Sequence, residues 1–250
     1  MGKLFSELFS KRYEIGVYSR GSFETEFTVF DSIESLYDFS NYLMIATPSE
    51  EIKEIITKLS KIDIGEKKVI FDICTFKEDF IDEYKRLPQP LNIASAHPMF
   101  SEGIETLNGQ KVIVVPVKRR EQGAHHVETF FEEFKAEVFL MDVEEHDKLM
   151  KILIGVPYFF GISYLSLISE FEDLEKCGGT SFEYLSTYGK AVLNDSPAFI
   201  EEVIGHSTDI VEDCIGDMDI SKDEIDRLKE KYSDDIKESY SSMYDVLREV

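Results

Sequence analysis

The chain has 250 residues, of which 43% are hydrophobic, and its 50 acidic and 27 basic residues give a formal net charge of −23. A chain of this length and apolar content can bury a large core, which excludes an intrinsically disordered protein and is typical of two domains. The strong negative charge disfavours binding to nucleic acid and to anionic membranes, so we expect neither as a partner. The three cysteines follow no disulfide or metal pattern, which favours a reducing cytoplasm and predicts no metal site.

Short β-branched runs alternate with amphipathic helical patterns through the first part of the chain. The expected strands are 14–18, 42–46, 68–73, 92–96, 111–115 and 137–141. This alternation predicts an α/β fold with a doubly wound, mostly parallel, Rossmann-like sheet. Strand signals stop near residue 142, and the helices expected beyond it are 144–170, 181–193, 198–214 and 222–250. We therefore predict an α/β domain over residues 1–142 and an all-helical domain over 143–250.

The longest uncharged run, Ile152–Ser169, is close to the length that spans a membrane. It contains Gly155, Pro157 and Gly161 and has no second spanning partner. We interpret this run as a helix buried in a protein interface rather than as a membrane anchor.

The sequence opens where a dinucleotide-binding unit would already have reached its first helix. Such a unit begins with a strand and a G-x-G-x-x-G turn. Here Gly2 stands in the place of the last glycine, so the predicted sheet lacks its first strand and two of the three glycines. Two explanations remain open: a misassigned or shortened start, or a protein that lacks the element and binds dinucleotide weakly or not at all.

Residues at three predicted strand ends are candidates for binding the cofactor. Ser19 and Arg20 follow the strand at 14–18, about where the ribose-reading residue belongs, and a hydroxyl beside a guanidinium suits the 2′-phosphate of NADP. The sequence therefore slightly favours NADP over NAD, although a solvated arginine in a turn explains Arg20 equally well. Gly2 and three residues at later strand ends complete the predicted cofactor site: Thr47, Pro48 and Asp72.

Two neighbouring strand ends carry the residues with catalytic chemistry. Asp72, Thr75 and Lys77 follow one buried strand, and His97 ends the next, within His-Pro-Met-Phe. Ligands of open α/β sheets bind outside the carboxyl ends of strands, so these side chains can share one site. The pattern D-x-x-[S/T]-x-K, helix, strand, H-P-M-F resembles the prephenate dehydrogenase family, and the resemblance covers about residues 1–165.

The resemblance implies an enzyme of tyrosine biosynthesis that converts prephenate to 4-hydroxyphenylpyruvate and transfers a hydride to NAD or NADP. His97 then matches the catalytic histidine, whose neutral imidazole accepts the proton of the substrate hydroxyl. Thr75 matches the serine that orients the substrate hydroxyl, and it is also a good N-cap for a helix. Lys77 would lie in the first turn of that helix, where a cation is disfavoured, which suggests a positioning or anion-binding role.

The resemblance further implies a substrate site and a homodimer. Lys190 stands where the family has a carboxylate-binding arginine, and His146 lies in the Glu-His-Asp motif that opens the first helix of the second domain. Alternatively, Asp142–Glu145 simply caps that helix and His146 completes a surface turn. Two other functions stay open: a related dehydrogenase of small hydroxy acids, and a dimeric scaffold or sensor without dinucleotide binding.

Overall fold

A computed structural model describes residues 1–21, 24–62, 68–88, 91–216 and 221–248 of the chain. It divides into two compact units, Met1–Lys148 and Leu149–Val250, each of which we describe by itself. The division falls inside helix α5, a little beyond the predicted boundary at residue 142.

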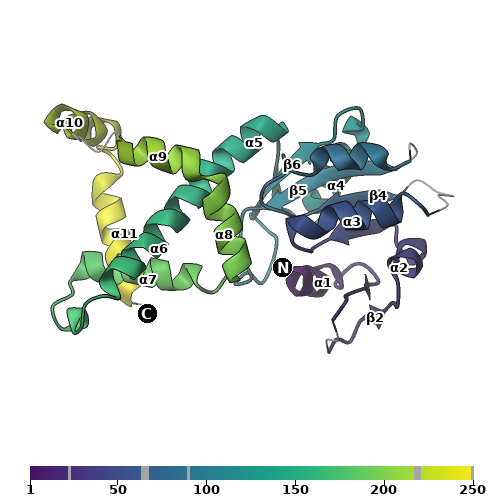
Figure 1. Ribbon diagram of the computed structural model, residues 1–250, viewed down its shortest axis with the longest axis horizontal. Coiled ribbons are helices and arrows are strands. Elements are labelled where there is room, and N and C mark those ends of the chain that lie inside the picture. The colour runs from purple at the N-terminus through teal and green to yellow at the C-terminus, as the bar shows by residue number, and fades with distance from the viewer. Residues whose placement is uncertain (22–23, 63–67, 89–90, 217–220, 249–250) are drawn as a thin grey trace. The chain divides into compact units, whose positions relative to one another are not determined.

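The first unit is built on two sets of strands (Figure 1). One is a parallel pair, β1 (Gly16–Val17) and β2 (Thr28–Val29). The other is a five-stranded sheet in the order β3 (Tyr42–Ile45), β4 (Val69–Asp72), β5 (Asn92–Pro98), β6 (Lys111–Pro116) and β7 (Glu137–Leu140). All of its neighbours are parallel except β5 and β6, so the predicted mostly parallel α/β fold is confirmed.

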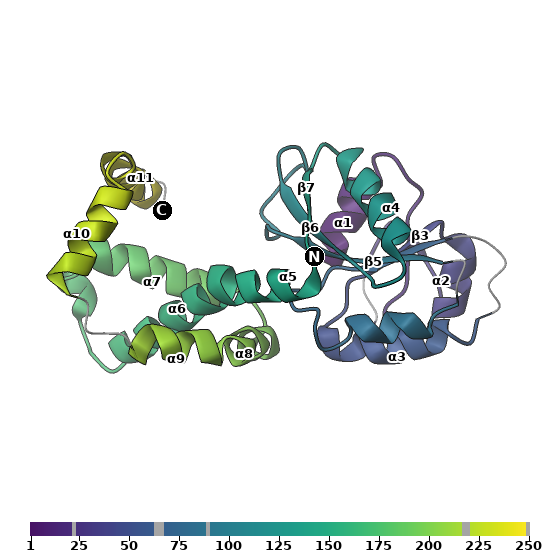
Figure 2. The ribbon, with the colours of Figure 1, turned by 90° about the horizontal axis from the view of Figure 1, so that it is seen from above.

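Helices cover both faces of the five-stranded sheet (Figure 2). On one face, α1 (Gly2–Phe9) and α4 (Glu121–Glu132) enclose a core rich in phenylalanine, in which Phe5, Phe9 and Phe131 are buried. On the other face lie α3 (Ser49–Leu59) and the 3₁₀ helix η1 (Ile81–Arg86). This sandwich holds the ends of the central strands in fixed positions, which is the condition for a precise site.

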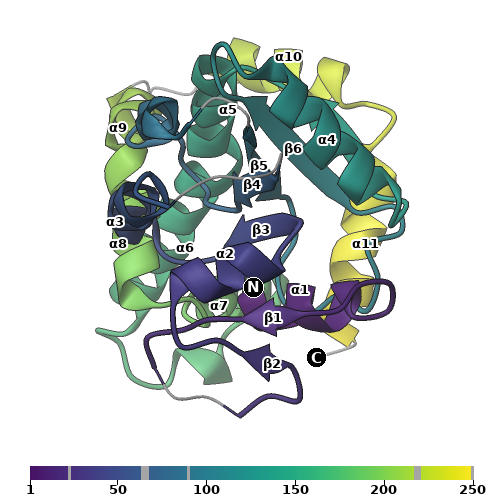
Figure 3. The same cartoon turned by 90° about the vertical axis from the view of Figure 1, so that its right-hand side faces the viewer.

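The six strands predicted from sequence are all present, whereas β2 and the helix α2 (Ile33–Phe39) are additional. Helix α2 does carry the signals of a short helix, with Ser32 as its N-cap and Ile33 and Tyr37 buried four residues apart, whereas β2 is only two residues long. Figure 3 shows the β1–β2 pair as a separate ribbon beside β3 at the end of the main sheet. The sheet of this unit is therefore split between β1 and β3.

The second unit is helical throughout its described residues. Its elements are the end of α5 (Val143–Met150), the π-helical turn η2 (Lys151–Gly155), α6 (Val156–Ile168), the 3₁₀ turn η3 (Leu174–Lys176), α7 (Thr180–Val192), α8 (Pro197–His206), α9 (Thr208–Gly216), α10 (Lys222–Lys231) and α11 (Ile236–Arg248).

Two helices predicted as continuous are broken in this unit. The expected 198–214 helix divides at Ser207, where the chain packs against η2 so closely that a Cβ on Gly155 would lie 1.7 Å from the Ser207 hydroxyl oxygen. The expected 222–250 helix divides between Tyr232 and Asp235. Tertiary contact at Gly155 thus overrides helical periodicity at the first break; nothing in the structure explains the second.

Within the described residues, one helical stretch, Val143–Ile168, is long and apolar enough to cross a membrane by length and composition. Only 11% of its most apolar 18-residue segment is buried inside the chain. Large side chains such as Leu153, Phe160 and Leu167 are about half exposed. The predicted interface helix therefore presents an uncovered apolar surface, and a protein partner remains a prediction.

The close packing of α4 on β5 gives a first prediction. A Cβ on Gly123 would lie 2.2–2.6 Å from backbone atoms of Ile93, so an added methyl group must displace a central strand. We expect Gly123→Ala to lower the free energy of unfolding by about 3 kcal/mol in urea denaturation. Gly103→Ala, which meets nothing within 4 Å, is the matched control. Equal urea midpoints for the two variants would contradict the described α4–β5 contact.

Candidate active site

The ends of β4 and β5 are joined by a buried ion pair. Asp72 closes β4, and one of its oxygens accepts hydrogen bonds from the Cys74 N–H at 3.0 Å and from the Lys77 Nζ at 3.1 Å. Its other oxygen accepts from the Tyr84 hydroxyl at 2.9 Å. Lys77 also donates to the carbonyls of Cys74 and of Ala96 on β5, the latter at 2.6 Å. Both charged side chains are fully buried, and all three Lys77 donors are used.

The segment after β4 does not form the helix that the sequence predicts at Thr75. The chain turns instead, and the 3₁₀ helix η1 begins only at Ile81. The backbone N–H groups of Lys77 and Glu78 donate to the carboxylate of Asp147, at 3.0 and 2.8 Å. The prediction of Thr75 as an N-cap is therefore wrong, because a carboxylate from α5 binds the N–H groups that a helix cap would have satisfied.

A chain of hydrogen bonds runs from Asp147 to His97. His146 Nδ1 lies 2.6 Å from Asp147 Oδ1, and His146 Nε2 lies 3.1 Å from His97 Nδ1. A carboxylate only accepts, so His146 carries its proton on Nδ1 and offers a lone pair at Nε2. His97 must then donate from Nδ1, which assigns its lone pair to Nε2. Among the described residues, Nε2 of His97 has no hydrogen-bond partner and is the acceptor left for a ligand.

The surroundings keep both imidazoles neutral. Burial lowers the pKa of His97 well below its ordinary value, and the positive charge of Lys77 and the neighbouring His146 lower it further. Burial also lowers the pKa of His146, although Asp147 opposes that shift. The pKa of Asp147 is raised by burial but lowered more by hydrogen bonds from His146 and from the backbone of Glu78 and Lys77, so the group stays a carboxylate.

Three predicted catalytic residues and His146 thus come together in the first unit. His97 and Thr75 are buried, at 5% and 8% exposure, and the saturated Lys77 ammonium binds the carbonyl of Ala96, the residue before His97. Because Lys77 has no donor left for an external anion, the structure favours the positioning role over the anion-binding one. His146 contacts His97 rather than open space, so its predicted contact with substrate remains a prediction.

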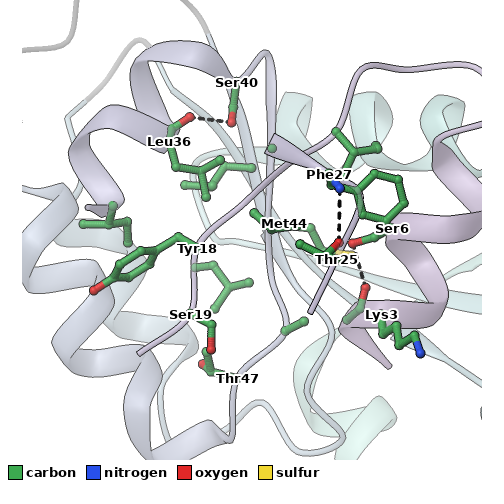
Figure 4. A pocket seen from close by; sticks show the side chains of 18 of the residues that line it. Lys3, Ser6, Tyr18, Ser19, Thr25, Phe27, Leu36, Ser40, Met44 and Thr47 are labelled. Carbon is green, nitrogen blue, oxygen red and sulfur yellow. Dashed lines mark hydrogen bonds between the residues drawn. The ribbon is translucent and has the colours of Figure 1, made fainter. Parts of the chain in front are cut away.

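Five of the six predicted cofactor residues line one cavity of about 1270 Å³: Gly2, Ser19, Arg20, Thr47 and Pro48. In Figure 4 this cavity extends along β3 from Ser40 past Met44 to Thr47, and Ser19 lies at the Thr47 end. Asp72 is not among the lining residues. It is enclosed by Lys77 and Tyr84, with no oxygen directed to this cavity.

The rim near Gly2 has features that fit a dinucleotide. Helix α1 begins at Gly2 and has no side-chain cap, so its first N–H groups can bind a phosphate. A Cβ on Gly2 would lie 3.3 Å from the Cβ of Ala46, so the start of α1 packs closely against the residue that follows β3. Arg20 is exposed and forms an ion pair with Glu51, so a 2′-phosphate would have to replace that carboxylate.

Lys190, the remaining predicted residue, is exposed on α7 in the second unit. Sequence reasoning missed two others, Asp147 and Tyr84. Asp147 stood next to His146 in the Glu-His-Asp motif, which was the available signal. Asp142 also caps α5, as the alternative interpretation expected, by accepting from the Glu145 N–H at 2.9 Å. The other part of that interpretation is wrong, because His146 is fully buried within α5 and not in a surface turn.

Comparison with known proteins places these features in a family. Residues 17–140, about half of the chain, match the family model described as the nucleotide-binding domain of prephenate dehydrogenase. A comparison with curated proteins found no match.

Several solved structures share the fold. The prephenate dehydrogenase from A. aeolicus, in complex with hydroxyphenyl propionate and NAD+, has a TM-score of 0.70 at 20% identity, over 100% of this chain and 92% of that one. Synechocystis arogenate dehydrogenase has a TM-score of 0.60 at 13% identity, over 89% and 80%. An imine reductase from Pseudomonas sp. has a TM-score of 0.53 at 13% identity, over 96% and 75%. At these identities the likeness shows the fold alone.

The buried neutral histidines predict a pH-dependent stability. An unfolded histidine titrates near pH 6.5, whereas His97 in the folded chain stays neutral to much lower pH. Below pH 6.5 the unfolded chain therefore binds more protons, and stability falls by about 1.4 kcal/mol per pH unit for such a group. We expect His97→Asn to remove that share of the slope in urea denaturation between pH 6.5 and 5. His125→Asn, which changes an exposed histidine on α4, should keep the slope; an unchanged slope in His97→Asn would show that His97 is not buried neutral.

Proposed function

The chain belongs to the prephenate dehydrogenase family, and we propose that it oxidises prephenate to 4-hydroxyphenylpyruvate and carbon dioxide with a nicotinamide dinucleotide as hydride acceptor. The observation that carries the proposal is the Asp147–His146–His97 chain, which leaves one imidazole nitrogen able to accept a proton. Arogenate, which has an amino group in place of the side-chain ketone, is the alternative substrate and is favoured by no residue described above.

The proposed reaction places one proton on this chain. The bound nicotinamide supplies the acceptor for the hydride that leaves the ring carbon bearing the hydroxyl. The proton of that hydroxyl passes to Nε2 of His97 as the hydride leaves. The bond to the ring carboxylate then breaks, so that its electrons complete the aromatic ring, and Nε2 of His97 returns the proton to the phenolate oxygen of the product. Because His97 is neutral well below pH 6.5, it is ready to accept this proton over the whole neutral range.

The other residues of the site act by position. Asp147 fixes the tautomer of His146, and His146 fixes that of His97. Lys77 holds the end of β4 to the carbonyl of Ala96, the residue before His97. Thr75 supplies a hydroxyl at the same strand end and orients the substrate. Each group thereby reduces the motion of the reacting nitrogen, which is what proximity contributes to catalysis.

The cofactor and substrate sites follow from the residues at strand ends and on α7. Gly2, Thr47 and Pro48 hold the dinucleotide at the α1 rim, and Ser19 with Arg20 favours NADP slightly. Lys190 binds a substrate carboxylate as a point charge, where a bidentate arginine would bind it more tightly. That weaker clamp is the one feature that favours the alternative of a related small-acid dehydrogenase.

The proposal also includes a homodimer and a cytoplasmic location. The exposed apolar side chains on α6 and the adjoining turn, such as Leu153 and Phe160, suit an interface with a second copy of this chain. A homodimer in the cytoplasm agrees with this surface and with the cysteine pattern. Sedimentation would distinguish a dimer from a monomer.

The first functional prediction concerns His97. We expect His97→Asn to lower kcat with prephenate by about 10²- to 10⁴-fold, because asparagine cannot take up the hydroxyl proton. The dissociation constant for NADP should stay within about twofold, since His97 is not among the residues that line the cofactor cavity. Absorbance of the reduced cofactor measures kcat, with prephenate and arogenate each tested against NAD and NADP, and calorimetry measures binding. Normal turnover in this variant would remove His97 from the mechanism.

The second functional prediction concerns the tautomer of His97, that is, which of its ring nitrogens carries the proton. In Asp147→Asn, an amide N–H facing His146 reverses the donor and acceptor along the chain and puts the His97 proton on Nε2. We expect kcat to fall by about 10²- to 10⁴-fold while the fold is kept. Nitrogen-15 NMR should report the His97 proton on Nδ1 in the natural chain and on Nε2 in the variant. Glu144→Gln, an exposed change on the same helix, is the control; a natural chain with its His97 proton on Nε2 would refute the assignment.

A further inference from the structure

One side of α3 and the turn after β1 form a charged part of the wall of the cavity described above. Glu51, Glu54 and Lys58 are three and four residues apart, so they lie on the same side of α3, and all three line the cavity. Arg20 lines the same cavity from the turn after β1. We refer to these four residues, two cations and two carboxylates, as the charged wall.

Each cation of the charged wall is bound by one carboxylate. Arg20 forms an ion pair with Glu51, and Lys58 Nζ lies 2.8 Å from Glu54 Oε1. The two pairs also act on each other: the pKa of Glu54 is lowered first by the hydrogen bond and charge of Lys58, and further by the charge of Arg20. The four groups therefore share one local field, in which two positive and two negative formal charges cancel.

Both ion pairs are open to solvent, so their partners can be replaced. The side chains of Arg20 and Lys58 are 61% and 42% exposed, and exposed ion pairs contribute little to stability. A phosphate dianion has twice the charge of a carboxylate and three acceptor oxygens, and it can bind a guanidinium through two parallel hydrogen bonds. A phosphate that reaches this wall is therefore able to displace the carboxylates from both cations.

The charged wall lies where the adenosine end of a dinucleotide would be held. In a dinucleotide-binding unit the pyrophosphate lies at the start of the first helix, and the ribose 2′ position lies beside the end of the strand that follows this helix. Gly2 and Ser19 occupy those two places on the cavity rim. In Figure 4 Ser19, the residue before Arg20, lies at the Thr47 end of the cavity, just before α3 begins. A group on the 2′ oxygen would therefore lie close to the charged wall.

NAD and NADP would interact with different members of the charged wall. The 2′-hydroxyl of NAD can donate to the carboxylate of Glu51 while Arg20 stays paired with it. The 2′-phosphate of NADP, with a charge near −2 at neutral pH, binds Arg20 only after Glu51 has turned away, and it is repelled by Glu54. The two carboxylates therefore favour the hydroxyl, and the two cations favour the phosphate.

We propose that Arg20 and Lys58 form a two-cation site for the 2′-phosphate of NADP, and that Glu51 and Glu54 compete with this phosphate and so set the preference between NADP and NAD. The proposal rests on the dinucleotide site of the proposed function and adds three determinants on α3. It also gives a physical reason for a slight preference, because each cation already has a bound carboxylate. Neutralising Glu51 frees Arg20 and makes the preference for NADP strong.

Calorimetry with two adenosine nucleotides tests the proposal on the full chain. AMP and adenosine 2′,5′-bisphosphate differ only in the 2′-phosphate, and neither requires prephenate or a nicotinamide. We expect Glu51→Gln to raise the affinity for the bisphosphate about tenfold and to leave the affinity for AMP equal or lower. Arg20→Gln and Lys58→Gln should each lower the affinity for the bisphosphate about tenfold, toward that of AMP.

Two variants on the same helix control for a general effect of charge. Glu50→Gln and Lys53→Gln make the same charge changes at residues of α3 that are not among those lining the cavity. Both should keep the ratio of the two affinities found in the natural chain. A loss of bisphosphate affinity in Lys53→Gln as large as in Lys58→Gln would overturn the proposal, as would an unchanged ratio in Glu51→Gln or the absence of binding by both nucleotides.

The test separates this proposal from the proposed activity. Expected shifts in nucleotide affinity together with no oxidation of prephenate would contradict the activity and support the two-cation site. Oxidation of prephenate with the same ratio of KM for NADP and NAD in the natural chain and in Glu51→Gln would contradict the two-cation site alone.

Discussion

The carboxylate of Asp147 is the group on which the candidate active site depends. It is almost fully buried and accepts hydrogen bonds from three sources: the backbone N–H groups of Lys77 and Glu78 and the imidazole of His146. A buried carboxylate is stable only when it is bound in this way, since desolvation otherwise favours the neutral form. The same oxygens therefore fix the loop after β4 to α5 and determine which nitrogen of His97 is free. Loop geometry and proton chemistry have one common cause.

The buried ion pair of Lys77 and Asp72 also helps to hold the loop after β4 and the end of β5 in position. Burying two charges is costly, and a paired interior charge seldom adds net stability over an apolar replacement. What the pair supplies is position, because Lys77 reaches the carbonyl of Ala96 while Asp72 holds the Tyr84 hydroxyl. The charge of Lys77 also lowers the pKa of His97. The ammonium thus contributes to catalysis through geometry and through the field at the imidazole.

Sequence patterns were sufficient for the five-stranded sheet, although not for β2, and they did not predict this hydrogen-bond network. All six predicted strands exist, because short β-branched runs between helices have few alternative structures. The helix expected at Thr75 does not form, because the N–H groups that would begin it are taken by a carboxylate 70 residues away in the chain. The contact between His97 and His146 spans 49 residues. Local hydrophobic periodicity contains no information about contacts between residues this far apart in the chain. The one signal in the sequence was that Asp147 directly follows His146 in the Glu-His-Asp motif.

The proton acceptor His97 and the rim of the cofactor cavity differ in how the chain fixes their positions. His97 stands near the end of β5, which pairs with β4 up to Ser95 and with β6 through His97 itself, so the chain holds the proton acceptor in place. The cofactor rim is formed by the ends of β1 and β3, which have no strand between them in the described residues. The distance from Ser19 to Thr47 therefore depends on side-chain packing around the cavity rather than on backbone pairing between β1 and β3. The proton acceptor is thus fixed by backbone pairing and by the Asp147 carboxylate, whereas the cofactor rim is fixed by the side chains that pack around its cavity.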